Sequence, residues 1–161
     1  MTSSLTTLTS ENNTLLVIIP LSGIPGLRMT TYSGRDLTQT LEPTPESGSL
    51  AESVNGETLD LSYPWFQKLQ STVTCKDTMA PCLNRVWIGQ LCVVQCVVER
   101  SYETSYDTPD RSVVSGSSRV EGEFTFYRPE LTMRITAIRN GLAEYRADYS
   151  WQIDFRELVA S

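Results

Sequence analysis

The chain has 161 residues, of which 40% are hydrophobic and 20% are charged, and its formal net charge is −6. That length suits one domain with a single core. The sequence contains no histidine, which excludes Ser-His-Asp and Cys-His catalysis as well as histidine metal sites. The acidic balance argues against nucleic-acid binding. The longest apolar run, Leu15–Leu21, argues against membrane insertion because a spanning helix needs roughly 20 residues.

The first part of the chain predicts a lead-in followed by short strands. Residues 1–13 are rich in Ser, Thr and Asn, so we expect a flexible lead-in there and a single domain over 14–161. Leu15–Ile19 is typical of a strand that is buried on both faces. Leu27–Tyr32 and Leu37–Leu41 predict two further short strands.

Residues 42–56 carry prolines, glycines and several acids, and they predict a long surface loop. Loops of this length are uncommon without a role, so we interpret it as a contact loop. Its candidate contact residues are Glu42, Glu46, Glu52 and Asn55.

The segment after this loop predicts a strand and then a helical turn. Leu59–Tyr63 alternates like a half-buried strand. Pro64–Leu69 is the one helix candidate, because proline is tolerated at the first helical position. Trp65 follows this proline and is a further candidate contact residue.

Val86–Tyr102 gives the strongest strand signal. Apolar residues occupy both faces of this segment, which favours a central strand over an edge strand. Trp87 and Trp151 lie at apolar positions of their segments, so both are expected in the core.

The four cysteines are Cys75, Cys82, Cys92 and Cys96. None of their spacings is a C-x-x-C pair, which gives zinc binding and thiol redox chemistry little support. Cys92 and Cys96 are too far apart along one strand to bond each other. We expect four free, mostly buried thiols, and a Cys75–Cys82 bridge is the alternative in an oxidising compartment.

A second polar loop follows at 106–118. Its candidate contact residues are Asp107, Asp110 and Arg111. The two aspartates match no EF-hand spacing, and Asp-x-Pro-Asp is ordinary turn chemistry, so no calcium site is predicted.

Val120–Phe126 predicts the next strand. Glu121 and Glu123 lie on one face of it, roughly 7 Å apart, a separation that an inverting glycosidase also uses. We interpret them as a solvated face that alternates with apolar residues. The sequence therefore predicts no catalytic, cofactor-binding or metal-binding residue.

The end of the chain predicts a hairpin with strands at 131–138 and 142–155. In the second strand the odd-numbered residues are apolar and the even-numbered ones are polar. A three-residue loop, Arg139–Gly141, pairs Ile135 with Tyr145 and keeps the apolar faces together, whereas a one-residue slip inverts every side chain.

Together these segments predict an all-β fold. Eight to ten short strands, with turn signals about every 10 residues, are typical of an antiparallel β-sandwich or a jelly-roll-like barrel. At most one short helix is expected.

The Ser/Thr-rich start that runs into Leu15–Pro20, the polar loops between valine-rich strands and the closing hairpin resemble one family of modules. These are the protruding or spike β-sandwich domains of non-enveloped RNA virus capsid proteins. The resemblance implies a structural protein of the virion surface, assembled in the host cytoplasm, that forms dimers or trimers and contacts a host receptor or glycan. Because the chain has no basic RNA-binding arm, it is more similar to an outward-facing module than to a whole coat protein.

A cellular carbohydrate- or ligand-binding β-sandwich is the alternative function. Exposed aromatic residues on a concave face favour that alternative, whereas a symmetric oligomer with a large apolar interface favours the spike domain. An enzyme is not expected, since a cleft with two close carboxylates, one of raised pKa, would be needed. The two polar loops are expected to meet at one end of the domain.

Overall fold

The computed structural model describes residues 16–21, 32–48, 50–62 and 67–158. Strands make up 55% of the structure and helix 2%, which confirms the predicted all-β class. Within these ranges there are twelve strands, all paired antiparallel, and one 3-10 helix, η1 (Pro45–Ser47). No helix in this part of the chain is long and apolar enough to cross a membrane.

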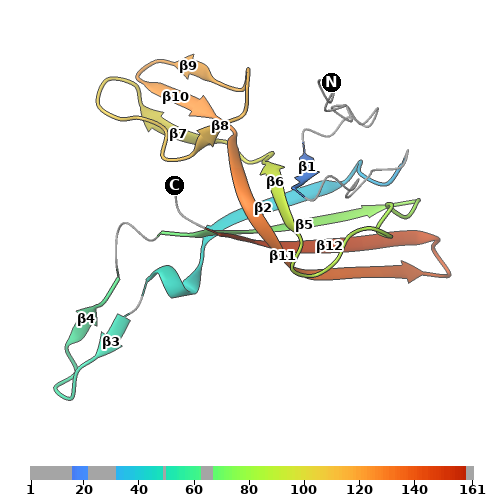
Figure 1. Ribbon diagram of the computed structural model, residues 1–161, viewed down its shortest axis with the longest axis horizontal. Helices are drawn as coiled ribbons and strands as arrows, with labels where there is room; N and C mark the ends of the chain where they lie inside the picture. Colours follow the sequence, from blue (N-terminus) through green and yellow to red (C-terminus); the bar gives the residue numbers. More distant parts are fainter. Residues whose placement is uncertain (1–15, 22–31, 49, 63–66, 159–161) are drawn as a thin grey trace.

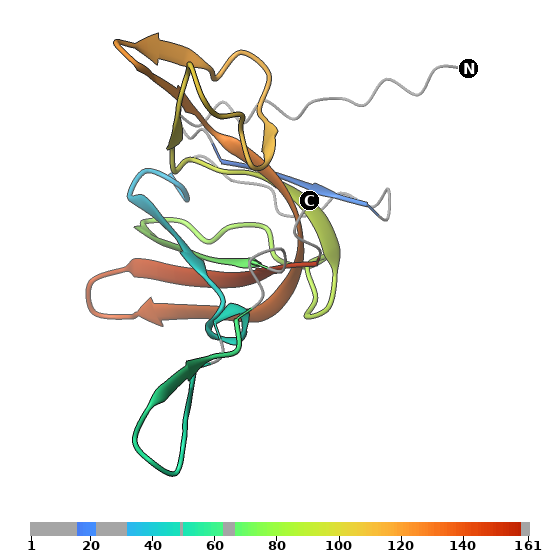
Figure 2. The same cartoon turned by 90° about the vertical axis from the view of Figure 1, so that its left-hand side faces the viewer.

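The main sheet has seven strands (Figure 1). Six follow the order β1-β6-β11-β12-β5-β2, and β8 pairs with β11 beside them. The sheet is strongly curved and does not close into a barrel (Figure 2). Its strands are β1 Val17–Pro20, β2 Leu37–Pro43, β5 Leu69–Asp77, β6 Leu91–Gln95, β8 Ser112–Val113, β11 Pro129–Ala143 and β12 Asp148–Glu157.

The core fills the inside of this curve. Every second residue is buried in β5, in β6, in β11 as far as Ile135 and in β12 from Trp151 onward, as expected when one face of each strand packs inward. The core extends to the edge strand β2, because Leu37 and Leu41 pack against the same cluster as the residues of the central strands. Fully buried members of this cluster include Val73, Val94, Met133 and Ile153.

Gln39 bridges the two sides of the curved sheet. Its side-chain nitrogen donates to Ser71 Oγ at 2.9 Å, and its side-chain oxygen accepts from the Val97 N–H at 2.6 Å. Val97 follows β6, which lies far from β2 in the strand order. A side-chain amide therefore joins edges that no strand ladder connects in the described part of the sheet.

Two buried carboxylates lie at opposite ends of the core. Asp77 ends the inward face of β5, and Glu157 ends the inward face of β12. Each is hydrogen-bonded to an arginine, Asp77 to Arg35 and Glu157 to Arg111. These partners matter because a buried charge without one is strongly unfavourable.

Two smaller sheets extend from the main sheet (Figures 1 and 2). The three-stranded sheet has the order β7-β10-β9, and the two-stranded sheet is the hairpin β3-β4. The hairpin points away from the rest of the chain, and we call residues 50–62 the arm. The strands are β3 Leu50–Glu52, β4 Thr58–Asp60, β7 Arg100–Glu103, β9 Arg119–Glu121 and β10 Phe124–Tyr127.

The C-terminal hairpin forms, but its predicted turn is wrong. The turn lies at Glu144–Ala147, and Gly141 is inside β11. Ile135 consequently faces Phe155 instead of Tyr145, which is fully exposed. Around Ile135 the two registers differ by an even number of residues, so both bring apolar residues together there and the alternation could not distinguish them. A register shift between Ile135 and Ala137 makes the difference odd in the outer half of the hairpin.

Four further strand predictions need correction. The segment at 120–126 is not one strand with Glu121 and Glu123 on one face, because β9 and β10 form a hairpin that turns at Gly122 and Glu123. Val86–Tyr102 is not one strand: β6 and β7 are separate, and Trp87 lies in the preceding loop, 45% exposed. β1 is a half-buried edge strand and is not buried on both faces. β5 was not predicted at all, because Ser71 and Asp77 on its inward face obscure the alternation.

The first polar loop is more ordered than predicted. Residues 42–56 contain the end of β2, η1 and β3, and the strand expected at 59–63 is the exposed β4. The predicted strand at 27–32 falls almost wholly, and the helical turn at 64–69 half, outside the described residues. All four cysteines are free and three are buried, which confirms the expected thiols.

Candidate interaction surface

The arm is a hairpin held together by its own backbone. β3 and β4 pair Ala51 with Leu59. The turn is closed by the Ser53 N–H, which donates to the Glu57 carbonyl, and by the Gly56 N–H, which donates to the Ser53 carbonyl, both at 2.8 Å. Gly56 has φ +77°, a left-handed conformation that glycine adopts at little cost.

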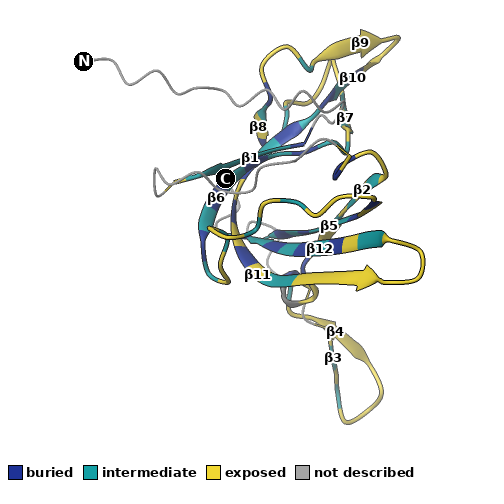
Figure 3. Ribbon diagram, turned by 90° about the vertical axis from the view of Figure 1, so that its right-hand side faces the viewer, coloured by how far each residue is buried: buried dark blue, intermediate teal, exposed yellow. Residues whose placement is uncertain are grey.

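Four large aliphatic side chains of the arm are exposed (Figure 3). Leu50 is 70% exposed, Leu59 46%, Leu61 62%, and Val54 is fully exposed. An isolated two-stranded hairpin is marginally stable in water because it has little apolar surface to bury. The register places Leu59 and Leu61 on one face of the hairpin and Leu50 on the other. Exposed apolar side chains on such a projection are typical of a surface that binds a partner.

The arm is also acidic. It carries Glu52, Glu57 and Asp60, and the sequence from 44 to 62 contains no Lys or Arg. Within the described ranges none of these three carboxylates lies within ion-pair distance of a basic group. Hydrogen bonds from Ser62 lower the pKa of Asp60, so its negative charge persists in mild acid.

Polar contacts fix the base of the arm. The hydroxyls of Thr44 and Ser47 are 2.5 Å apart and both side chains are buried. The Thr44 N–H donates to the Lys68 carbonyl at 2.9 Å, and the Lys68 N–H donates to Ser47 Oγ at 3.0 Å. The segments that enter and leave the arm are thus held together beside β2 and β5.

A buried ion pair lies next to this base. Arg111 Nε donates to Glu157 Oε1 at 2.8 Å, and Arg111 Nη2 donates to the Gln67 carbonyl at 2.6 Å. The second Glu157 oxygen accepts from the Leu69 N–H at 2.8 Å. Gln67 in turn donates to the Ser47 carbonyl at 3.2 Å. The bases of the two polar loops are therefore linked at one end of the main sheet.

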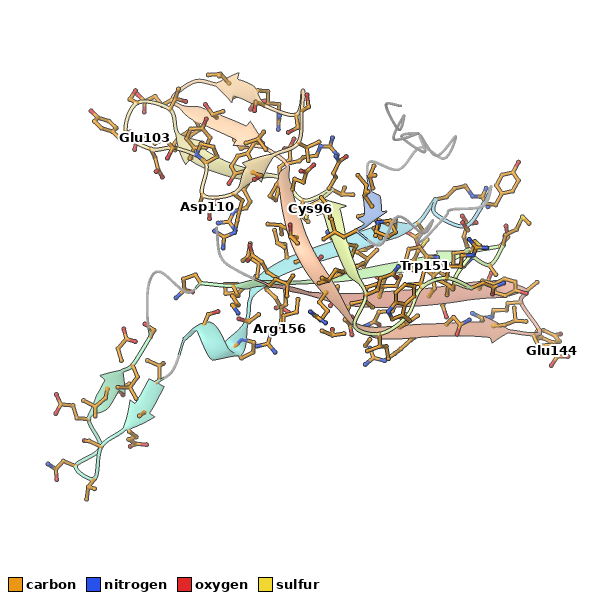
Figure 4. All side chains as sticks on the ribbon, in the orientation of Figure 1. Cys96, Glu103, Asp110, Glu144, Trp151 and Arg156 are labelled. Atoms are coloured by element: carbon orange, nitrogen blue, oxygen red, sulfur yellow. The ribbon has the colours of Figure 1, made fainter. Side chains whose placement is uncertain are left out.

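Asp110 extends this network to the three-stranded sheet. Its carboxylate accepts from the Tyr127 hydroxyl at 2.5 Å and from Arg100 Nη2 at 2.8 Å. Burial, together with the hydrogen bond to the Asp110 carboxylate, raises the pKa of Tyr127 to about 12. Asp110 lies on the side of the small sheet that faces the main sheet (Figure 4). The network fixes the position of the small sheet.

The predicted contact residues fall into two groups. Glu42, Glu52, Asn55, Asp107 and Asp110 are exposed, and two of these, Glu52 and Asn55, are on the arm. Glu42 projects from β2, where it accepts a hydrogen bond from Gln70 at 2.8 Å. Asp107 lies on the second polar loop, so the exposed residues do not form one surface.

The remaining predicted contact residues lie in the polar network, in η1 or outside the described residues. Asp110 and Arg111 belong to the polar network: Arg111 is buried, whereas the Asp110 side chain is 47% exposed, so Asp110 stays a predicted contact residue. Glu46 lies in η1, and Trp65 is outside the described residues. The exposed aliphatic residues of the arm were missed, because Leu59 and Leu61 alternate like a half-buried strand.

The opposite end of the core carries a second ion pair. Arg35 Nη2 donates to Asp77 Oδ1 at 2.7 Å, and the guanidinium lies 4.5 Å from the ring centre of Tyr32. Hydrogen bonds from Arg35 hold the pKa of Asp77 well below its usual range. An open depression of about 470 Å³ next to this pair is lined by charged residues that include Lys76 and Asp148, 3.4 Å apart.

The outer face of the main sheet has a second open depression of about 390 Å³. Thr38, Thr74 and Gln152 line it, together with Arg139, which pairs with Asp154 at 3.3 Å. Two of its charged lining residues, Lys76 and Arg139, form ion pairs, whereas Asp36 forms none with the described residues. Among the residues that can be placed, no group of three or more Cys, Asp or Glu side chains could hold a metal ion.

No family model matches the chain, and no curated protein or solved structure matches it. The arm is one described feature whose exposed apolar side chains need an explanation.

Proposed function

We propose that the chain is a structural module without catalytic activity that associates with further copies of itself through the arm. The observation that carries this proposal is the exposure of Leu50, Val54, Leu59 and Leu61 on a hairpin that projects from the body. Exposed aliphatic side chains contribute nothing to folding while they face water. They do stabilise an association that buries them, by roughly 25 cal/mol per Å² of apolar surface.

The finer proposal is a protruding domain of a capsid protein of a non-enveloped RNA virus. It rests on the resemblance of the sequence to such domains and on the acidic net charge of −6. In that setting the module lies on the virion surface and is assembled in the host cytoplasm. The exposed loops are then available to a host receptor or glycan.

A ligand-binding β-sandwich has less support. A concave binding face needs accessible aromatic side chains, whereas the inside of this sheet is filled by its own core, including Trp151 at 2% exposure. Both depressions are open, and the charged residues that line them, with the exception of Asp36, form ion pairs. These features suit a scaffold better than a pocket for a sugar.

The test is sedimentation velocity over a concentration series. We expect reversible oligomers for the natural chain and weaker association, by about tenfold or more, for the double variant Leu59→Ser/Leu61→Ser. Tyr145→Ser is the matched control, because Tyr145 is fully exposed at the other hairpin tip, and it should associate normally. A natural chain that stays monomeric up to millimolar concentration would overturn the proposal.

A further inference from the structure

A second exposed apolar surface lies on the loop between β5 and β6. Trp87 is 45% exposed and Ile88 is 66% exposed. The loop is pinned to β11, because the Gly89 N–H donates to the Ile135 carbonyl at 2.7 Å and the Gln90 N–H closes a turn to the Trp87 carbonyl at 3.2 Å. Trp87 and Ile88 are therefore presented on a turn fixed to the main sheet.

Two arginines accompany these side chains. Arg85 precedes them in the loop, and Arg134 of β11 donates to the Gly89 carbonyl at 3.2 Å. Neither arginine has a carboxylate within ion-pair distance among the described residues. We call Arg85, Trp87, Ile88 and Arg134 the turn patch.

The two arginines of the turn patch contrast with five other arginines of the described chain. Arg35, Arg100, Arg111, Arg119 and Arg139 each pair with a carboxylate. The arm shows the opposite excess, with unpaired carboxylates beside exposed aliphatic side chains. The two surfaces thus match in both respects: each exposes apolar groups, and their uncompensated charges have opposite sign.

We propose that the arm of one copy docks on the turn patch of a second copy. This inference rests on the proposed self-association and names the surface that receives the arm. Docking within one molecule is disfavoured, because the arm extends away from β11 and the body (Figures 1 and 3). Trp87 is the expected anchor, since tryptophan side chains are enriched among the residues that dominate binding energy.

The inferred contact joins two different surfaces, and this decides the type of assembly. Each copy offers one arm and one turn patch, so both remain available at the ends of any short chain of copies. Such head-to-tail contacts form rings if the rotation closes and open filaments if it does not. A two-fold contact of arm with arm would stop at a dimer.

Mixing complementary variants tests the inference. The arm variant is Leu59→Ser/Leu61→Ser, and the patch variant is Trp87→Ser/Ile88→Ser. Each alone should bind copies of itself about 30-fold more weakly than the natural chain. An equimolar mixture should form one-to-one dimers and nothing larger, because the intact patch of the first binds the intact arm of the second. Circular dichroism confirms that both variants are folded.

Charge exchange gives a second test if the Trp87 variant does not fold. Arg85→Glu/Arg134→Glu and Glu52→Lys/Glu57→Lys alter only exposed side chains. Each should associate poorly alone, and the mixture should regain association, because the charges are opposite again.

The outcomes separate the two proposals. Weak association of the arm variants combined with normal association of every patch variant would overturn the turn patch and leave self-association through the arm standing. Variants that are each deficient but show no recovery on mixing, for both pairs, would also overturn it. A natural chain that is strictly monomeric would overturn both proposals.

Discussion

At the scale of single residues, the buried pair of Arg111 and Glu157 is the most consequential interaction. Their side chains are 7% and 2% exposed. Glu157 also accepts the Leu69 N–H, so it satisfies the first backbone donor of β5 as well as the guanidinium. A buried ion pair of this kind contributes modestly when intact, but removal of one partner leaves an uncompensated charge.

Glu157→Gln should therefore lower the free energy of unfolding by about 3 kcal/mol, because the buried Arg111 loses its close counter-ion and keeps only the more distant, half-exposed carboxylate of Asp110, at 3.8 Å. Urea titration followed by circular dichroism measures this loss. Glu42→Gln is the control: Glu42 is exposed, and its loss should stay within about 0.5 kcal/mol. Equal effects of the two substitutions would contradict the structural role of Glu157.

At the scale of elements, the hairpin of β11 and β12 contains a strained turn. Ala147 has φ +51°, in the left-handed region that disfavours residues with a Cβ atom. The turn forms there because the long register places Phe155 opposite Ile135 in the core. Packing along β12 has thus fixed the turn position in preference to the glycine at 141.

Ala147→Gly should raise the free energy of unfolding by about 0.5–1 kcal/mol, because glycine removes the strain at positive φ. Ala143→Gly is the control within β11, where the loss of strand preference should destabilise by a similar amount. Thermal unfolding of both variants measures these two changes in stability. If the turn lay at Asn140–Gly141, Ala147 would be a strand residue and Ala147→Gly would destabilise instead.

These elements show what the sequence could predict and what it could not. The strand class and the inward positions of Trp151, Ile153 and Phe155 followed from local alternation, a property of single strands. Registers and long-range contacts did not follow. The pairing of Arg111 with Glu157 spans 46 positions in the chain, and nothing local distinguishes this arginine from an exposed loop residue.

The candidate surface was predictable only in part. Composition did predict a contact region that includes the acidic residue Glu52 and the turn at Asn55. The apolar half of the surface was not, because a leucine in an alternating segment usually faces a core. Exposure of Leu59 follows from the arm's projection away from the main sheet, which is a property of the whole molecule.

At the scale of the whole molecule, burial inside the curved sheet determines how reactive the thiols are. Cys92 faces the core from β6, Cys96 faces it directly after the end of β6, and Cys75 faces it from β5. Burial raises the pKa of Cys92 to about 12 and that of Cys96 to about 11, and it raises the pKa of Cys75 too. Only the thiolate reacts with electrophiles, so these three groups are protected by both access and protonation.

Cys82 differs because it is exposed on the loop that carries the turn patch. At pH 8 we expect a thiol reagent to modify one cysteine per native chain rapidly and all four after denaturation in urea. Cys82→Ser should remove the rapid reaction and leave the stability unchanged. A Cys75–Cys82 bridge would instead leave two reactive thiols in urea, and rapid modification of Cys92 or Cys96 would mean that the core opens far more readily than this packing allows.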